Sequence, residues 1–253
     1  MKKRLDVVLV ERGLCDSRTR AQALLMEGKV RVKGQVERKA SRIVDDVVDV
    51  EVASPPKFVS RGGEKMEGAF KSFPELSSKG KICLDVGSST GGFTDCLLQY
   101  GAEKVMAVDV GTNQLAWSLR SDPRVWVKEN YNARFMKKED LPYEPQLAVT
   151  DVSFISLKLI LPPIKEVLAP GGEIVALIKP QFEVGKGNAP GGLVRDEALR
   201  LAARDEIVRF AREDLALELL GLEQSPIKGR EMGNIEYLSY WRSPVHPYPT
   251  FLN

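Results

Sequence analysis

Ile82-Cys83-Leu84-Asp85-Val86-Gly87-Ser88-Ser89-Thr90-Gly91-Gly92-Phe93 is the stretch of this 253-residue chain that decides its fold. A short apolar run ends on a carboxylate, and a glycine-rich turn follows before an amphipathic segment. This order is typical of a ligand site at the carboxyl edge of a parallel sheet. The spacing Gly-x-x-x-Gly-Gly differs from the dinucleotide-binding pattern, and no Gly-Lys-Ser/Thr ends the turn as in a phosphate-binding loop.

The acid at the end of the first strand favours a ligand with a cationic group, because a carboxylate repels the phosphates of a nucleotide. S-adenosylmethionine has an ammonium and a sulfonium group, so the motif predicts a methyl-donor site. A second apolar run, 104–108, ends on Asp109 at the separation at which an acid meets ribose hydroxyls in such folds. One such Asp alone could simply cap a helix or a turn. Two of them on neighbouring predicted strands favour a cofactor site.

The composition is that of an ordinary globular protein, with 43% hydrophobic and 28% charged residues. No apolar run approaches the ~20 residues of a membrane helix, and the start at Met1 turns acidic too soon for a secretory signal. The three cysteines lack Cys-x-x-Cys spacing, which is typical of thiols in a reducing compartment. The single histidine, His246, leaves little for a metal site. We therefore expect a cytoplasmic protein with no metal and no membrane partner.

Positive charge is concentrated at the amino terminus. Residues 1–42 contain twelve Lys or Arg against five acids, whereas residues 59–253 contain 24 against 26. This asymmetry indicates a basic module joined to a near-neutral one, and basic modules commonly contact phosphate backbones. The prolines at 55 and 56 favour a stiff linker. The domains expected are a basic domain over 1–54, a linker over 55–59, a catalytic domain over 60–242 and a tail over 243–253.

The basic module has the pattern of two short helices and a small sheet. Apolar residues of helical spacing begin at Leu5, and Ser17 is a good N-cap for a second helix. Strands are expected over 30–32 and through Val47, Val50 and Val52. The arrangement resembles the alpha-L RNA-binding fold of the ribosomal protein S-four family, whose basic face contacts structured RNA by shape and phosphate charge. The residues expected to contact RNA are Arg4, Arg18, Arg20, Lys29, Arg31 and Lys33. A merely solvated charged face is the alternative.

Strand and helix patterns alternate through the larger module, which predicts an α/β fold with a doubly wound sheet. One predicted strand ends on Asp151 and another on Lys179. A polar helix start carries Lys65, and the last predicted strand carries Glu236 near its beginning. Functional residues of such sheets gather at the carboxyl ends of the strands.

These four side chains together have the chemistry for alkylating a hydroxyl. A ribose 2′-hydroxyl is a poor nucleophile unless it loses its proton as methyl transfer proceeds, and a lysine with a lowered pKa can accept that proton. The carboxylates would orient the amine and balance its charge. Taken singly, each residue has a plainer explanation, since a lysine at a strand end is more often a solvated surface charge.

The segment from Gln181 to Arg195 is rich in glycine and has little hydrophobic pattern. A long loop of this kind beside a cofactor cleft is predicted to cover the substrate. Lys186 and Arg195 would then touch RNA phosphates. The alternative is that they only solvate the loop.

Several motifs in order along residues 1–242 are similar to those of the TlyA family, haemolysin-named proteins regarded as ribosomal RNA 2′-O-methyltransferases with a Rossmann-like, FtsJ-type class I catalytic domain. The motifs are Ser60-Arg61-Gly62-Gly63-x-Lys65, Asp85-Val86-Gly87, Thr90-Gly91-Gly92-Phe93-Thr94-Asp95, Asp151-Val152-Ser153-Phe154-Ile155-Ser156-Leu157, Lys179-Pro180-Gln181-Phe182-Glu183, Gly191-Gly192-x-Val194-Arg195-Asp196 and Gly233-Asn234-x-Glu236. One departure is Ser88, where alanine is commoner in the family.

The resemblance implies a catalytic tetrad of Lys65, Asp151, Lys179 and Glu236 in which Lys179 is the base. It implies S-adenosylmethionine as cofactor and a cytidine ribose of large-subunit ribosomal RNA as substrate, with the small subunit also modified by some members. The implied cofactor contacts are Asp85, Gly87, Ser88, Gly91, Gly92, Phe93 and Asp109. We add Asn130, with Asn132 as an equally placed rival.

Three other functions stay open at this point. A methyltransferase of small molecules or proteins would leave the basic domain without a role. An RNA-binding assembly factor would keep the fold without the chemistry, and a complete tetrad argues against it. A membrane-active haemolysin would account for the family's name, but the sequence has no spanning segment. The sequence does not set the oligomeric state, and a monomer is the simpler expectation.

Overall fold

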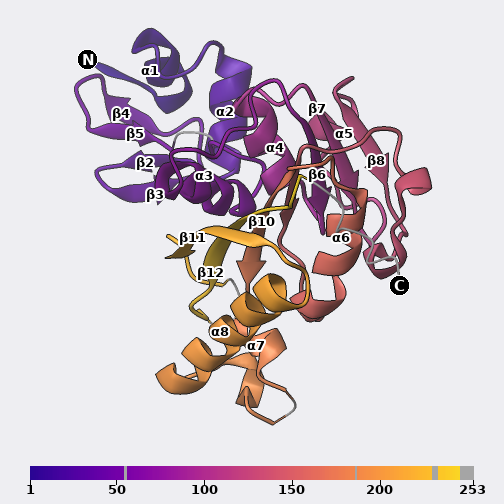
Figure 1. The fold of residues 1–253 in the computed structure, drawn as a ribbon. Helices are drawn as coiled ribbons and strands as arrows, with labels where there is room; N and C mark the ends of the chain where they lie inside the picture. The colour runs from indigo at the N-terminus through magenta and orange to yellow at the C-terminus, as the bar shows by residue number, and fades with distance from the viewer. Residues whose placement is uncertain (54–55, 186, 230–232, 246–253) are drawn as a thin grey trace, which may run out of the picture. The chain divides into compact units, whose positions relative to one another are not determined.

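The computed structural model describes residues 1–53, 56–185, 187–229 and 233–245 (Figure 1). The chain forms two compact units, Met1–Pro56 and Lys57–Asn253. Ser54 and Pro55 of the expected linker, and residues 246–253 of the expected tail, lie outside the described residues. The domain boundaries of the sequence analysis therefore stay predictions.

In residues 1–53, the first unit has two helices and five three-residue strands. Its elements are β1 (Lys2–Arg4), α1 (Leu5–Glu11), α2 (Arg18–Met26), β2 (Val30–Val32), β3 (Gln35–Glu37), β4 (Ile43–Asp45) and β5 (Val50–Val52). The strands form an antiparallel β1-β4 pair and an antiparallel sheet in the order β3-β2-β5. A small apolar core, which includes Leu5, Leu9 and Leu25, holds the helices against the strands.

The expected second helix and its N-cap are confirmed, because the Ser17 hydroxyl accepts a hydrogen bond from the Arg20 amide. The strand expected through Val47 was wrong in its first half. Val47 is 86% exposed and lies in a turn closed by a hydrogen bond from the Val48 amide to the Asp45 carbonyl, so pairing begins only at Val50.

The second unit is built on one seven-stranded sheet in the order β11-β12-β10-β9-β6-β7-β8. Its strands are β6 (Ile82–Val86), β7 (Lys104–Val108), β8 (Val125–Lys128), β9 (Leu147–Thr150), β10 (Glu173–Ile178), β11 (Glu218–Gln224) and β12 (Tyr237–Arg242). Its α-helices are α3 (Gly62–Ser72), α4 (Gly92–Gln99), α5 (Trp117–Arg120), α6 (Leu161–Val167), α7 (Pro180–Glu183) and α8 (Glu197–Glu213). Short 3-10 turns occupy Ala133–Phe135, Lys138–Asp140, Leu157–Leu159 and Pro190–Gly192.

The direction of β12 brings its first residues to the edge of the sheet at which the parallel strands end. Strands β6, β7, β8, β9 and β10 are parallel, whereas β12 runs antiparallel to β10, with Tyr237 opposite Ile178. The beginning of β12 therefore lies beside the carboxyl end of β10. Glu236, just before β12, reaches the same edge as Lys179, just after β10.

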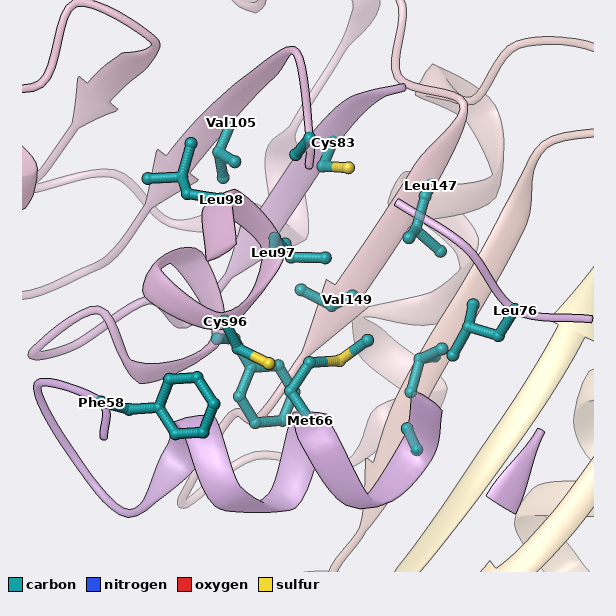
Figure 2. Packing of buried hydrophobic residues seen from close by; sticks show 14 of the residues in the cluster. Phe58, Met66, Leu76, Cys83, Cys96, Leu97, Leu98, Val105, Leu147 and Val149 are labelled. Atoms are coloured by element: carbon teal, nitrogen blue, oxygen red, sulfur yellow. The ribbon is translucent and has the colours of Figure 1, made fainter. Parts of the chain in front are cut away.

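Helices cover both faces of this sheet, as expected for a doubly wound fold. Alternating strand residues point to opposite faces, so Cys83 packs with Met66 of α3 and Leu97 of α4, as Figure 2 shows, whereas Leu84 packs with Ile164 of α6. The α/β fold class is confirmed.

The segment expected to be a loop, 181–195, is partly helical. Helix α7 begins at Pro180, whose fixed φ and missing N–H suit the first turn of a helix. A 3-10 turn occupies Pro190–Gly192. Within the described ranges, no helix is long and apolar enough to cross a membrane.

Candidate active site

A cleft of about 850 Å³ opens at the carboxyl edge of the second unit's sheet. All four residues of the expected tetrad line it, and so do Asp85 and the glycine-rich turn that follows β6. Its size lies within the range of small-molecule sites. The structure thus brings the predicted catalytic residues and most of the predicted cofactor residues to one place.

The tetrad is a chain of alternating charges. Lys65 Nζ lies 2.7 Å from Glu236 Oε2 and 3.4 Å from Asp151 Oδ2, and Lys179 Nζ lies 2.6 Å from Asp151 Oδ1. Asp151 therefore bridges the two lysines. Lys65, Lys179 and Glu236 are each less than 10% exposed, and buried charges of this kind persist only when they are paired.

The two lysines differ in their surroundings. Lys65 contacts two carboxylates, whereas Lys179 contacts one carboxylate and donates a hydrogen bond to the Ser153 hydroxyl at 2.8 Å. Lys65 is therefore a firmly held positive charge. Lys179 already donates to an alcohol oxygen on the cleft wall, which is the kind of group a ribose would present.

Asp85 is the buried acid of the site and is 1% exposed. Its Oδ2 atom accepts hydrogen bonds from the Thr94 amide at 2.9 Å and the Thr94 hydroxyl at 2.6 Å. Its Oδ1 atom has no hydrogen-bond partner among the described residues. Burial raises the pKa of Asp85 to about 7, with the Thr94 hydrogen bonds acting against it. A cationic ligand group at Oδ1 would reverse this shift.

The glycine-rich turn approaches its neighbours too closely for larger residues. Gly87 has φ +82°, and a Cβ there would lie 2.9 Å from Val152 Cγ1. At Gly92 a Cβ would lie 2.3 Å from Ser60 Oγ and 2.9 Å from the Cα of Gly62. Gly92 thus lets α4 begin against the start of α3, which carries Lys65.

Three of the predicted cofactor residues do not line the cleft: Gly91, Asp109 and Asn130. Asp109 accepts hydrogen bonds from the amides of Ser89 and Gly111, each at 2.7 Å, and so holds the turn after β6 against the turn after β7. The Asn130 amide donates to the Gly111 carbonyl at 2.9 Å. Contacts of these residues with a cofactor stay predictions.

Sequence reasoning missed an aromatic pair at the cleft. Phe154 is 83% exposed, and its ring centroid lies 5.2 Å from that of Phe182. Both rings line the cleft and a neighbouring hollow that also contains Asn132 and Arg134. Phe154 stands inside the quoted Asp151–Leu157 motif, but only the folded structure shows that an apolar ring there faces outward.

Two of the arginines expected to contact RNA are organised by one buried acid of the first unit. Asp6 is fully buried and accepts hydrogen bonds from Arg4 at 3.0 Å and from Arg18 and Gln22 at 3.1 Å. These hydrogen bonds, Arg4 first, hold the pKa of Asp6 well below its usual range. The sequence analysis missed this role of Asp6.

The other expected RNA contacts of this unit lie at its surface. Arg20, Arg31 and Lys33 are exposed, and Lys29 pairs with Glu27 at 2.6 Å. In the second unit Arg195 is exposed, whereas Lys186 lies outside the described residues.

Comparison with known proteins gives the class of each unit. Residues 58–242 match the FtsJ-like methyltransferase family, and residues 3–50 match the S4 domain. The chain is therefore a methyltransferase of the FtsJ-like class with an S4 domain.

Full-length relatives define the family more closely. The chain is 44% identical to the 16S/23S rRNA (cytidine-2′-O)-methyltransferase TlyA of Mycobacterium tuberculosis, over 96% of this chain and 90% of that protein. It is 45% identical to Hemolysin A of Brachyspira hyodysenteriae, over 94% of this chain and 99% of that protein. A solved structure from Streptococcus thermophilus, described as a candidate hemolysin, is 41% identical to this chain with a TM-score of 0.73. The match covers 98% of this chain and 92% of that one. The chain belongs to the TlyA family, and the resemblance stated from the sequence is confirmed.

Proposed function

We propose that this protein transfers the methyl group of S-adenosylmethionine to the 2′-hydroxyl of a cytidine in ribosomal RNA. The observation that carries the proposal is the chain of ion pairs from Glu236 through Lys65 and Asp151 to Lys179, at the wall of a cleft that also holds Asp85. A methyltransferase acting on a base nitrogen with a free lone pair would not need a lysine as proton acceptor. The cytidine target is that of the relative from Mycobacterium tuberculosis.

The cleft suits S-adenosylmethionine as cofactor. The buried Oδ1 of Asp85, which has no hydrogen-bond partner in the described part of the chain, is an acceptor for an ammonium group, and Gly87 leaves the backbone close to the cleft. When bound, the cofactor supplies an electrophilic methyl group on sulfur. Ser88, Gly92 and Phe93 would line its binding site.

Lys179 is the proton acceptor in this proposal. In its neutral amine form, Lys179 would accept the proton of the ribose hydroxyl at Nζ during methyl transfer and would later release it to solvent. Asp151 orients Lys179, and Lys65 fixes Asp151 from the other side with the help of Glu236. Alignment of the reacting atoms supplies much of the remaining acceleration.

The S4 domain and the charge of residues 1–42 support ribosomal RNA as the partner. An S4-type basic face contacts structured RNA mainly through phosphates. We propose the large subunit as the first substrate and the small subunit as the second, following the 16S/23S specificity of the relative. The reducing, cytoplasmic location expected from the sequence fits this substrate.

The test incubates the protein with radiolabelled S-adenosylmethionine and ribosomal subunits from cells that lack it, and then maps the label by nuclease digestion and mass spectrometry. We expect one methyl group on a cytidine ribose. Lys179→Ala should lower the rate about 10²-fold or more, since general base catalysis contributes on this scale. Lys138→Ala, which removes an exposed lysine paired with Glu144, is the matched control and should keep the parental rate.

Label on a base or on protein would contradict the ribose assignment. Cofactor binding without transfer to either subunit would favour a non-catalytic assembly factor. Lysis of membranes by Lys179→Ala at the parental level would favour the haemolysin alternative.

A further inference from the structure

Phe154 has a backbone conformation that L-residues rarely adopt. Its φ is +63°, in the left-handed region, where a large side chain is strained. Strain of this kind persists only when surrounding contacts over-determine the conformation, and it clusters at functional sites. Burial of the ring does not hold Phe154, since the ring is 83% exposed.

Two hydroxyl groups on either side of Phe154 fasten this segment to α7 and the residue before it. On one side the Ser153 hydroxyl accepts a hydrogen bond from Lys179 at 2.8 Å. On the other side the Ser156 hydroxyl donates to Glu183 Oε2 at 2.5 Å, and the Leu157 amide donates to Glu183 Oε1 at 2.9 Å. The segment 153–157 is therefore held at both ends, by the residue before α7 and by the last residue of α7.

Glu183 is a half-buried acid that the proposed chemistry does not use. Its carboxylate is engaged by a hydroxyl and a backbone amide, and burial raises its pKa above the usual range. Among the described residues its carboxylate forms no ion pair closer than 4.0 Å, although Lys158 acts on it at longer range. A half-buried carboxylate is costly unless it is hydrogen-bonded, so the bonds from Ser156 and Leu157 offset the burial of Glu183.

We propose that Glu183 is a positioning residue that holds Phe154 in its strained conformation, so that the ring stands beside Phe182 at the mouth of the cleft as a platform for the acceptor nucleotide. This inference rests on the proposed function, because the platform is useful only for an RNA substrate. Glu183 acts through Phe154 and does not itself touch the reacting groups. Aromatic faces stack on unpaired bases with little dependence on base identity.

The test compares Glu183→Ala with Glu183→Gln in methyl transfer to ribosomal subunits. Gln keeps an acceptor for the Leu157 amide and can donate to the Ser156 oxygen, so Glu183→Gln should stay close to the parent. Glu183→Ala should lower kcat/KM for the RNA about tenfold or more, as displacement of a substrate-contacting group does. The dissociation constant for S-adenosylmethionine should not change. Glu206→Gln is the matched control, because Glu206 pairs with Lys158, the residue after this segment, whereas Ser156 and Leu157 donate their hydrogen bonds to Glu183.

A double-mutant cycle separates positioning from a general loss of structure. If Glu183 acts through Phe154, the variant with both Glu183→Ala and Phe154→Ala should be no slower than Phe154→Ala alone. The proposal would be overturned if the losses of kcat/KM in the two single variants multiplied fully in the double variant. It would also be overturned by a Glu183→Ala variant with parental kcat/KM.

A second measurement does not depend on methyl transfer. Chymotrypsin cleavage after Phe154, followed by mass spectrometry, should be several-fold faster in Glu183→Ala and unchanged in Glu206→Gln, with other cleavage sites unaffected. Equal acceleration at all sites would mean that Glu183 only stabilises the fold and would refute the positioning role. If the parent protein methylates no RNA, the proposed function fails, whereas this cleavage pattern still reports on the contact between Glu183 and the Phe154 segment.

Discussion

Asp85 and Phe154 are two residues whose burial or backbone conformation is unfavourable for folding. One is a buried carboxylate with an oxygen that no described residue hydrogen-bonds, and the other is a phenylalanine in a left-handed conformation with its ring exposed. In native proteins, residues with unfavourable burial or backbone conformation are expected at functional sites. Both residues line the same cleft, which strengthens its assignment as the active site.

Cofactor affinity should depend on the protonation of Asp85. Since the pKa of Asp85 is about 7 in the free protein, acidification below pH 7 neutralises the carboxylate and should weaken binding of S-adenosylmethionine. Calorimetry near pH 6.5, in buffers of different ionisation enthalpy, should show proton release on binding. Asp85→Asn should abolish that release, and a parental release in this variant would rule out Asp85 as its source.

The raised pKa of Asp85 affects folding stability in the opposite direction from cofactor binding, because low pH favours the folded protein. The folded-state pKa lies above the ordinary value of 3.8, so the free protein binds more protons than the unfolded chain between these values. The contribution of Asp85 to stability is therefore complete below about pH 4 and is lost as the pH rises through about 7. Asp85→Asn should flatten this part of the stability profile.

Substitutions at Phe154 should expose the strain in its backbone. Phe154→Ala and Phe154→Gly both remove the exposed ring, but only glycine adopts φ +63° without a steric cost. The Gly variant should be more stable than the Ala variant by about 1 kcal/mol. Chemical denaturation of the two proteins measures the difference, and an Ala variant as stable as the Gly variant would show that the position is not strained.

Most elements that position the site could be predicted from the sequence, because each has a local pattern. Buried runs ending on Asp85, Asp151 and Lys179 mark strand ends, and parallel strand ends meet at one edge. The contacts between elements could not be predicted in this way. The bridge from Asp151 to both lysines and the hydrogen bonds from the 156–157 segment to Glu183 depend on distances between segments far apart in the chain.

The junction of α3 and α4 shows why a glycine in a motif can be misjudged. Gly92 was expected to contact the cofactor, and it does line the cleft. The structure adds a packing role, since its Cα faces the start of α3 with no space for a side chain. The spacing of glycines in a sequence does not distinguish a glycine that approaches a ligand from one that approaches another helix.

Gly92→Ala should therefore destabilise the protein and displace Lys65. The new Cβ would lie 2.7 Å from the Gly63 amide nitrogen, which cannot move independently of α3. Overpacking of this kind costs about 1–3 kcal/mol, measured by urea denaturation. Gly62→Ala is the matched control at the same junction, since its Cβ would meet no atom closer than 3.4 Å. Equal losses in the two variants would contradict the packing argument.

At the scale of the whole molecule, charge and chemistry are divided between the two units. The ion pairs of the proposed tetrad are internally balanced, whereas residues 1–42 contain an excess of seven positive charges. Affinity for RNA should therefore come mainly from the first unit and be sensitive to salt, while cofactor binding depends on the second unit.

Salt dependence of RNA binding tests this division. Each phosphate contact contributes about one unit to the slope of log affinity against log salt concentration, so Arg20→Gln and Lys33→Gln should each reduce the slope by about one. Both side chains are exposed, and their loss leaves the apolar core of the first unit intact.

Lys138→Gln, which neutralises an exposed lysine of the second unit, is the control and should keep the parental slope. Filter binding to ribosomal RNA over a series of salt concentrations measures the slopes, and the dissociation constant for S-adenosylmethionine should be the same in all three variants. A parental slope in both first-unit variants would place the phosphate contacts elsewhere in the chain.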